Sequence, residues 1–138
     1  MTDGVKDVLG RYYSEVWGRG DVDACDDLLA DDYVDRDPTP GFGTDKAAAK
    51  QLVAAVTGGM KDVVMNVDHI IVDGDMAAAH WRLQWTQVGD FMGMVPADGK
   101  RLDLRGHDFY RMRGGKIAEI WHCEDFLGVL SQLGVLPT

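Results

Sequence analysis

The stretch RGHDFYRMRGGKIAEIWHCEDFLGVLSQLG, residues 105–134, decides how this chain folds. From Leu102 to Met112, even positions are apolar or small with one exception, and odd positions are mostly charged. Alternation with a period of two is typical of a strand that has one buried face. Gly114-Gly115 can supply the positive φ values of a tight turn, and residues 117–125 form a second strand. The stretch therefore predicts a β-hairpin followed by a short closing helix.

The exception is Asp108, the single charged residue on the apolar face of the first strand. A buried carboxylate is costly unless another group partners it. A three-residue hairpin loop would place His122 on the same face as Asp108, whereas a strict two-residue loop would place Trp121 there. A carboxylate beside an imidazole orients the ring and makes it more basic, which suits proton transfer near neutral pH. The same pair would also serve as a buried ion pair without chemistry.

Length, composition and net charge limit the classes of fold and function that the chain can have. The 138 residues are 46% hydrophobic, which predicts a single domain over residues 1–138 with a real core. No apolar run is long enough to span a bilayer, and the acidic amphipathic N-terminus is unlike a signal peptide, so we expect a cytoplasmic protein. A net charge of −9 argues against nucleic acid and membrane partners. Neither Cys25 nor Cys123 has metal-ligand spacing, and we expect no metal site.

Helical periodicity precedes the strands. The pattern predicts helices over residues 2–17, 21–30 and 44–57, the last capped by Thr44. The segment 33–43 is rich in glycine and proline and is expected to be irregular. The period then changes to two over residues 62–72 and 76–88. In the first of these strands one face is expected to carry Val63, Met65, Val67, His69 and Ile71.

Helices followed by four consecutive strands favour an α+β fold with an antiparallel sheet. We expect the sheet to curve into a cone around the three N-terminal helices and to leave a cavity at its open end. The apolar segment 89–100 is a candidate lid or subunit contact. The side chains expected to shape the pocket are Tyr33, Asp37, Trp85, Gln87, Phe91, Met94 and Tyr110.

Two segments, GDFMGMVPADGKRL (89–102) and FYRMRGGKIAEIWHCEDFLGVLSQLG (109–134), resemble the SnoaL-like polyketide cyclase family. That family belongs to the nuclear transport factor 2-like superfamily of cone-shaped α+β domains. The segment DDYVDRDPTPGFGTDKAA (31–48) is similar too, so the resemblance spans nearly the whole chain. It implies a homodimer with an apolar pocket in each subunit, no cofactor, and aldol closure of a polyketide ring. In the cyclases a catalytic aspartate occupies the position of His122 and a histidine that of Asp108, so this chain carries the pair exchanged.

The leading hypothesis is therefore a cofactor-independent acid/base enzyme, of the cyclase or isomerase type, acting on a small apolar carbonyl-containing substrate. In this hypothesis His122 moves the proton next to the carbonyl and Asp108 orients the imidazole. One alternative is a hydrolase or a cofactor-free hydroxylase that uses the same pocket. Another is a non-catalytic module for small-molecule binding or dimerisation.

Overall fold

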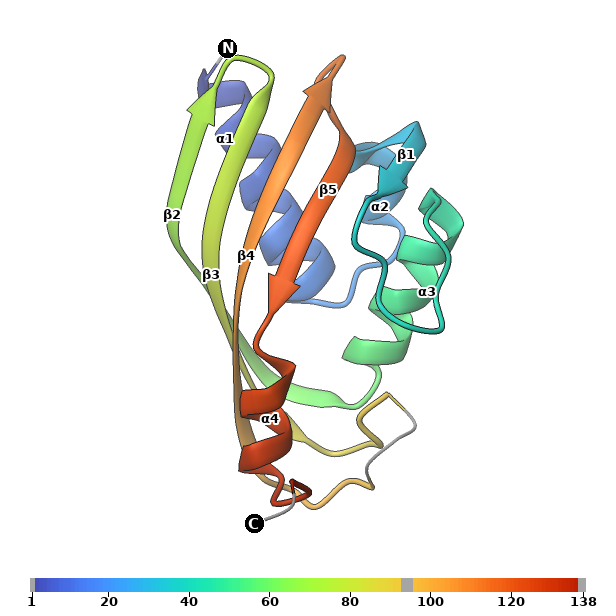
Figure 1. Cartoon of the computed structure of the whole chain (residues 1–138), viewed down its shortest axis with the longest axis vertical. Coiled ribbons are helices and arrows are strands. Elements are labelled where there is room, and N and C mark those ends of the chain that lie inside the picture. The colour runs from blue at the N-terminus through green and yellow to red at the C-terminus, as the bar shows by residue number, and fades with distance from the viewer. Residues whose placement is uncertain (1, 93–95, 137–138) are drawn as a thin grey trace.

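A computed structural model describes residues 2–92 and 96–136 of the chain. A curved five-stranded sheet is covered on one face by helices, and the chain ends lie at opposite ends of the molecule (Figure 1). The strand order is β1-β5-β4-β3-β2, with β1 parallel to β5 and all other neighbours antiparallel. The expected α+β class with a curved, unclosed sheet is confirmed.

The part of the chain that the structure describes contains four α-helices and one π-helical segment besides the strands. In chain order the elements are α1 (Thr2–Arg11), η1 (Tyr12–Trp17), α2 (Ala24–Leu28), β1 (Leu29–Asp35), α3 (Lys46–Thr57), β2 (Met60–Asp73), β3 (Met76–Gln87), β4 (Arg101–Arg113), β5 (Lys116–Glu124) and α4 (Phe126–Gln132). None of these helices is long and apolar enough to cross a membrane.

The first predicted helix has the expected extent, but its second half is wider than an α-helix. Residues 12–17 form the π-helical η1, and the amide of Gly18 donates to the carbonyl of Tyr13 at 2.8 Å. Such π segments occur mostly as single turns and often at functional sites. Here the wider turn buries both Tyr12 and Tyr13 against the sheet.

Strand β1 was not predicted. Residues 29–30 were expected in a helix and residues 33–35 in an irregular segment, whereas Leu29–Asp35 pairs in parallel with β5. The adjacent acidic residues of this edge strand mask its alternation, and its partner is far away in sequence. The third helix begins one residue later than predicted, because Asp45 and not Thr44 caps it by accepting from the amide of Ala48 at 2.8 Å.

The predicted face of β2 is wrong in its second half. A bulge between Val67 and His69 shifts the register, so His69 and Ile71 are exposed. The partly buried positions there are Ile70 and Val72, which pack on the core. The bulge therefore reverses the alternation that the sequence indicates.

The β4–β5 hairpin has the two-residue turn of one loop considered from the sequence and the side-chain arrangement expected for the other. Gly114 and Gly115 form a two-residue turn with φ values of 59° and 76°. A register shift then skips Ala118, so that Asp108 lies directly opposite His122. One extra residue in β5 thus restores the parity that a two-residue turn alone would have changed.

Trp81 of β3 lies opposite Gly106 of β4, on the inner face of the sheet. A Cβ atom at Gly106 would lie 2.2 Å from Cζ2 of the indole. The missing side chain therefore makes room for the indole, which is only 6% exposed. Gly106 sets the position of Trp81.

Replacing Gly106 by alanine should destabilise the fold by about 1–3 kcal/mol, because overpacking forces the indole to move. Denaturant unfolding measures this change. Gly10→Ala is the control: its added Cβ meets no atom within 4 Å in α1, and alanine there should add about 0.5–1 kcal/mol of stability. An unchanged unfolding midpoint in Gly106→Ala would contradict the assignment.

Candidate functional site

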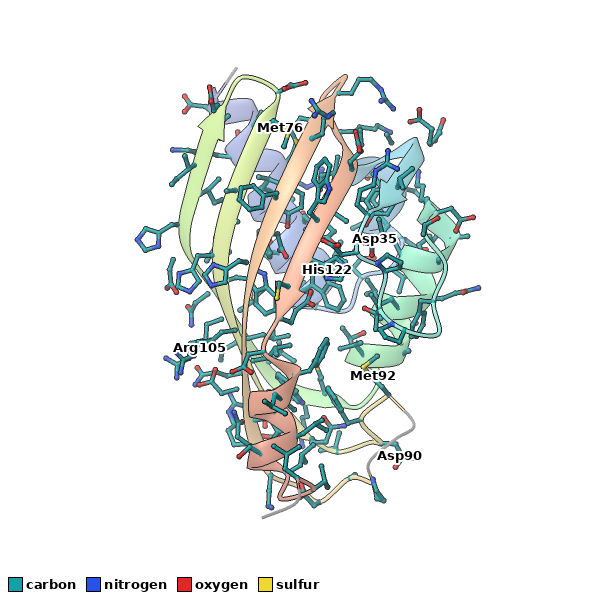
Figure 2. All side chains as sticks on the ribbon, viewed as in Figure 1. Asp35, Met76, Asp90, Met92, Arg105 and His122 are labelled. Carbon is teal, nitrogen blue, oxygen red and sulfur yellow. The ribbon has the colours of Figure 1, made fainter. Side chains whose placement is uncertain are left out.

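A cavity lies between the inner face of the sheet, including its edge strand β1, and the helical elements η1 and α3. Most of its wall is apolar and includes Leu29, Leu52, Val53, Val56, Leu83, Leu104, Ile120 and Phe126. Four side chains that can carry charge also line it: Asp35, Asp108, His122 and Glu124. Figure 2 shows Asp35 and His122 pointing toward one another, while Arg105 points away from the body of the molecule.

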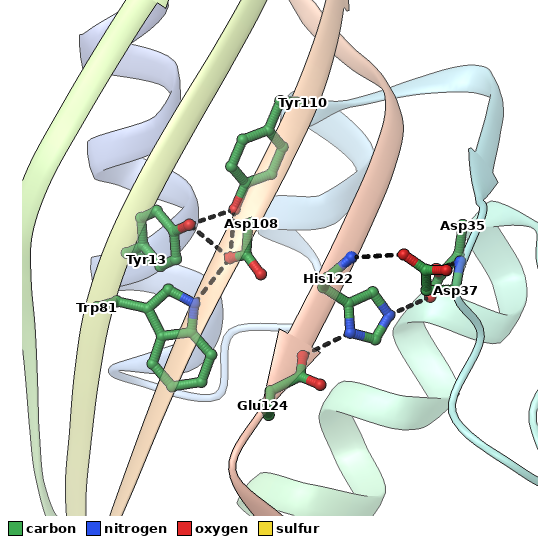
Figure 3. A network of polar contacts seen from close by, with 8 residues as sticks. All are labelled: Tyr13, Asp35, Asp37, Trp81, Asp108, Tyr110, His122 and Glu124. Carbon is green, nitrogen blue, oxygen red and sulfur yellow. Dashed lines mark hydrogen bonds and ion pairs between the residues drawn. The ribbon is translucent and has the colours of Figure 1, made fainter.

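Asp108 is held by three neutral donors from three different elements (Figure 3). Its Oδ2 accepts from Tyr13 Oη at 2.6 Å, from Trp81 Nε1 at 2.8 Å and from Tyr110 Oη at 2.9 Å. The single hydroxyl proton of Tyr110 is shared between Oδ2 and Tyr13 Oη, which lies 2.5 Å from the Tyr110 oxygen. No hydrogen bond to Oδ1 occurs within residues 2–92 and 96–136, where every fully buried polar side-chain atom has a partner. Oδ1 is therefore the oxygen of Asp108 that a molecule in the cavity can reach.

Burial changes the acidity of this group. Asp108 is only 4% exposed, and burial raises the pKa of its carboxyl to about 6, against the hydrogen bonds from Tyr13 and Tyr110, which lower it. The charge of Glu124 raises the pKa further and that of His122 lowers it. A carboxyl with this pKa can both accept and return a proton near neutral pH.

His122 is clamped between two carboxylates. Its Nε2 lies 2.9 Å from Asp35 Oδ2 and its Nδ1 lies 2.5 Å from Glu124 Oε1, so each ring nitrogen donates to an anion. Burial lowers the pKa of His122, but the hydrogen bonds and charges of Asp35 and Glu124 outweigh it and raise the pKa to about 10. The ring is therefore an imidazolium at neutral pH, and its backbone amide donates to Asp37 Oδ2 at 3.1 Å.

This geometry differs from the roles expected from the sequence. Asp108 and His122 line one cavity from neighbouring strands, but no hydrogen bond joins them in the described residues. Asp108 does not orient the imidazole, because Asp35 and Glu124 do so. His122 has no ring nitrogen left to accept a proton, which removes it as a general base in this arrangement.

The other residues expected in the pocket differ in position. Asp37 is not part of the cavity wall and accepts from the backbone amide of His122. Tyr33 lines the cavity, and Tyr110 lies behind Asp108 with no exposed surface. The buried residues Trp85, Gln87 and Phe91 are not part of the cavity wall. They contact one another: Trp85 Nε1 donates to Gln87 Oε1 at 2.7 Å, and the Trp85 and Phe91 rings stack at 6.3 Å. Met94 lies outside the described residues.

Four residues of the site were not predicted: Tyr13, Asp35, Trp81 and Glu124. A signal existed for Glu124, because it lies two positions after His122 on the same strand and therefore on the same face. Within residues 2–92 and 96–136, no three histidine, cysteine or acidic side chains are arranged to hold a metal ion.

A curved sheet over helices with an internal, mostly apolar cavity defines a class of small α+β domains. A sequence model of the SnoaL-like polyketide cyclase family matches residues 7–133. The chain belongs to this family.

Solved structures share the fold over nearly the whole chain. TsrD from Streptomyces laurentii is 25% identical, with a TM-score of 0.86 and coverage of 97% of both chains. A candidate polyketide cyclase from Acidithiobacillus ferrooxidans is 27% identical, with a TM-score of 0.81 and coverage of 95% of this chain and 94% of that one. IdmH from Streptomyces antibioticus, another candidate polyketide cyclase, is 27% identical, with a TM-score of 0.79 and coverage of 95% and 99%. No curated protein matches the chain.

The clamped imidazolium should make stability depend on pH. Because the pKa of His122 is raised in the folded state, its contribution is fully present below about pH 6.5 and is lost as pH rises toward about 10. We expect the free energy of unfolding of the wild type to fall by about 3 kcal/mol over this interval relative to His122→Gln. This is less than the full pKa shift would give, because solvent screens a partly buried ion pair. Urea unfolding at several pH values measures the difference.

His69→Gln is the matched control, since His69 is exposed on the other face of the sheet. It should keep the pH dependence of the wild type. Parallel curves for the wild type and His122→Gln would show that the ring is not held as an imidazolium.

Proposed function

We propose that this protein is an acid/base enzyme that acts on a small, apolar, carbonyl-containing substrate of polyketide type, without a cofactor. The observation that carries the proposal is the buried carboxyl of Asp108, with one oxygen held by three donors and the other reachable from an apolar cavity. Membership of the SnoaL-like polyketide cyclase family supports the same class of substrate. Proton transfer is assigned to Asp108 and not to His122.

The proposed reaction begins with Asp108 as a carboxylate. Its Oδ1 accepts the proton from the carbon next to a carbonyl; the C–H bond breaks and its electron pair moves into the enolate. The enolate carbon then attacks a second carbonyl of the same substrate, which forms a C–C bond and an alkoxide. Asp108 returns its proton to that alkoxide, so the carboxylate is regenerated and no electrons are gained or lost.

The surrounding residues keep Asp108 ready for this exchange. Tyr13, Trp81 and Tyr110 fix Oδ2 and thereby aim Oδ1 at the cavity. His122 acts as a positioning residue whose positive charge favours the ionised form of Asp108. Because both ring protons of His122 are held by carboxylates, it works through its charge and not by proton transfer.

Asp108→Asn should remove catalysis, since an amide cannot accept the proton. The assay is exchange of the acidic ring protons of 2-tetralone, an apolar bicyclic ketone, into deuterated water followed by NMR. We expect the rate above background to fall by about 10²–10⁴-fold, the usual contribution of a general acid/base group.

Asp103→Asn is the control, because Asp103 lies on the same strand but outside the cavity and binds Arg82. It should exchange protons at the wild-type rate. Wild-type exchange in Asp108→Asn would contradict the role of Asp108 and favour a non-catalytic binding module.

The pH profile of the same assay reports on the donors to Asp108. The wild-type rate should rise through about pH 6, as the carboxyl ionises. Tyr13→Phe removes a hydrogen bond that lowers the pKa of Asp108, so the rise should move to higher pH by about one unit. Tyr12→Phe is the control: Tyr12 packs edge-on against Tyr13 without bonding Asp108. An unmoved profile in Tyr13→Phe would refute this role.

A further inference from the structure

Negatively charged groups outnumber positively charged groups around the cavity. Three carboxylates and one imidazole line it, and no lysine or arginine of the described residues does. With Asp108 ionised and His122 protonated, two negative charges are in excess. A ligand therefore enters an apolar space whose polar end is acidic.

The one cation in this group offers nothing to an anionic ligand. Both ring nitrogens of His122 donate to carboxylates, and its backbone amide donates to Asp37. Its side chain is only 7% exposed. A ligand carboxylate placed here would lose its water without gaining a charged donor, which is costly.

Two of the three carboxylates, in contrast, keep one oxygen that accepts no hydrogen bond from the described residues. Both oxygens of Asp35 are used, one by His122 and the other by the amide of Asp37 at 2.9 Å. Glu124 uses Oε1 for His122, and Asp108 uses Oδ2 for its three donors. Glu124 Oε2 and Asp108 Oδ1 have no hydrogen-bond partner among the residues described, and an ionised carboxylate can only accept.

We propose that the cavity selects its ligand by charge: it binds an apolar ligand with a basic nitrogen more tightly than the uncharged equivalent, and the uncharged equivalent more tightly than the matching carboxylate. Glu124 is the specificity-determining residue, because its second oxygen is the acceptor not needed for proton transfer. This inference rests on the proposed function only in assigning the cavity to the substrate. It narrows that substrate to carbonyl compounds without a free acid group.

Three probes of one shape test the order of affinity: 2-naphthylmethylamine, 2-naphthalenemethanol and 2-naphthoate. Calorimetry with the whole protein, at about pH 7.5 and low salt, gives each dissociation constant. We expect the amine to bind about tenfold more tightly than the alcohol and the alcohol about tenfold more tightly than the acid, since partly buried charges are weakly screened.

Glu124→Gln should narrow the ratio of amine to acid affinity by about tenfold, because it removes one charge and adds a donor. Glu15→Gln removes the same charge outside the cavity, next to Arg11, and should leave the ratio unchanged. Circular dichroism checks that both variants fold.

The wild-type measurements alone can overturn the proposal. Equal or tighter binding of 2-naphthoate than of the alcohol would do so, as would failure of the alcohol to show saturable binding. A ratio that survives in a folded Glu124→Gln would remove Glu124 from its role. Proton exchange by Asp108 is independent of these results, so a failed charge order and a failed acid/base function can be told apart.

Discussion

Several elements of this structure depend on the hydrogen bonds that satisfy one buried carboxylate. Asp108 is enclosed by apolar residues, and its Oδ2 collects donors from η1, β3 and β4 at once. Two of these donors have their own structural requirement: the wide π turn brings Tyr13 inward, and the bare backbone of Gly106 makes room for Trp81. The packing of the sheet against η1 and the acidity of the Asp108 carboxyl therefore depend on the same few contacts.

Asp35 and Glu124, the other two carboxylates of the cavity, are satisfied in a different way from Asp108. Asp108 accepts from neutral donors only, and burial raises its pKa. Between Asp35 and Glu124, in contrast, lies a positively charged imidazolium. The imidazolium donates to both carboxylates, which leaves neither ring nitrogen free to accept a proton. Of the three carboxyl groups that line the cavity, only Asp108 has no charged hydrogen-bond partner among the described residues.

Local patterns were enough to predict most of this fold and part of its site. Alternation and Gly114-Gly115 predicted the β4–β5 hairpin, and Asp108 was found because it is the only charge on an apolar face. No local sequence pattern indicates β1, because it is an acidic edge strand whose partner β5 comes much later in the chain. The place of Asp35 in the site was missed for this reason. Tyr13 and Trp81 were missed for a related reason: each reads as ordinary core until long-range packing brings it to Asp108.

The unpaired Ala118 in β5 has an implication for how such cavities diversify. If Ala118 paired with Arg111 and was not skipped, the register of the remaining strand would slip by one residue, and Trp121 would face the interior in place of His122. A change in strand pairing, without any substitution, would then replace the polar wall by an aromatic one. Related chains with the same turn can thus present different chemistry through the presence or absence of a single bulge.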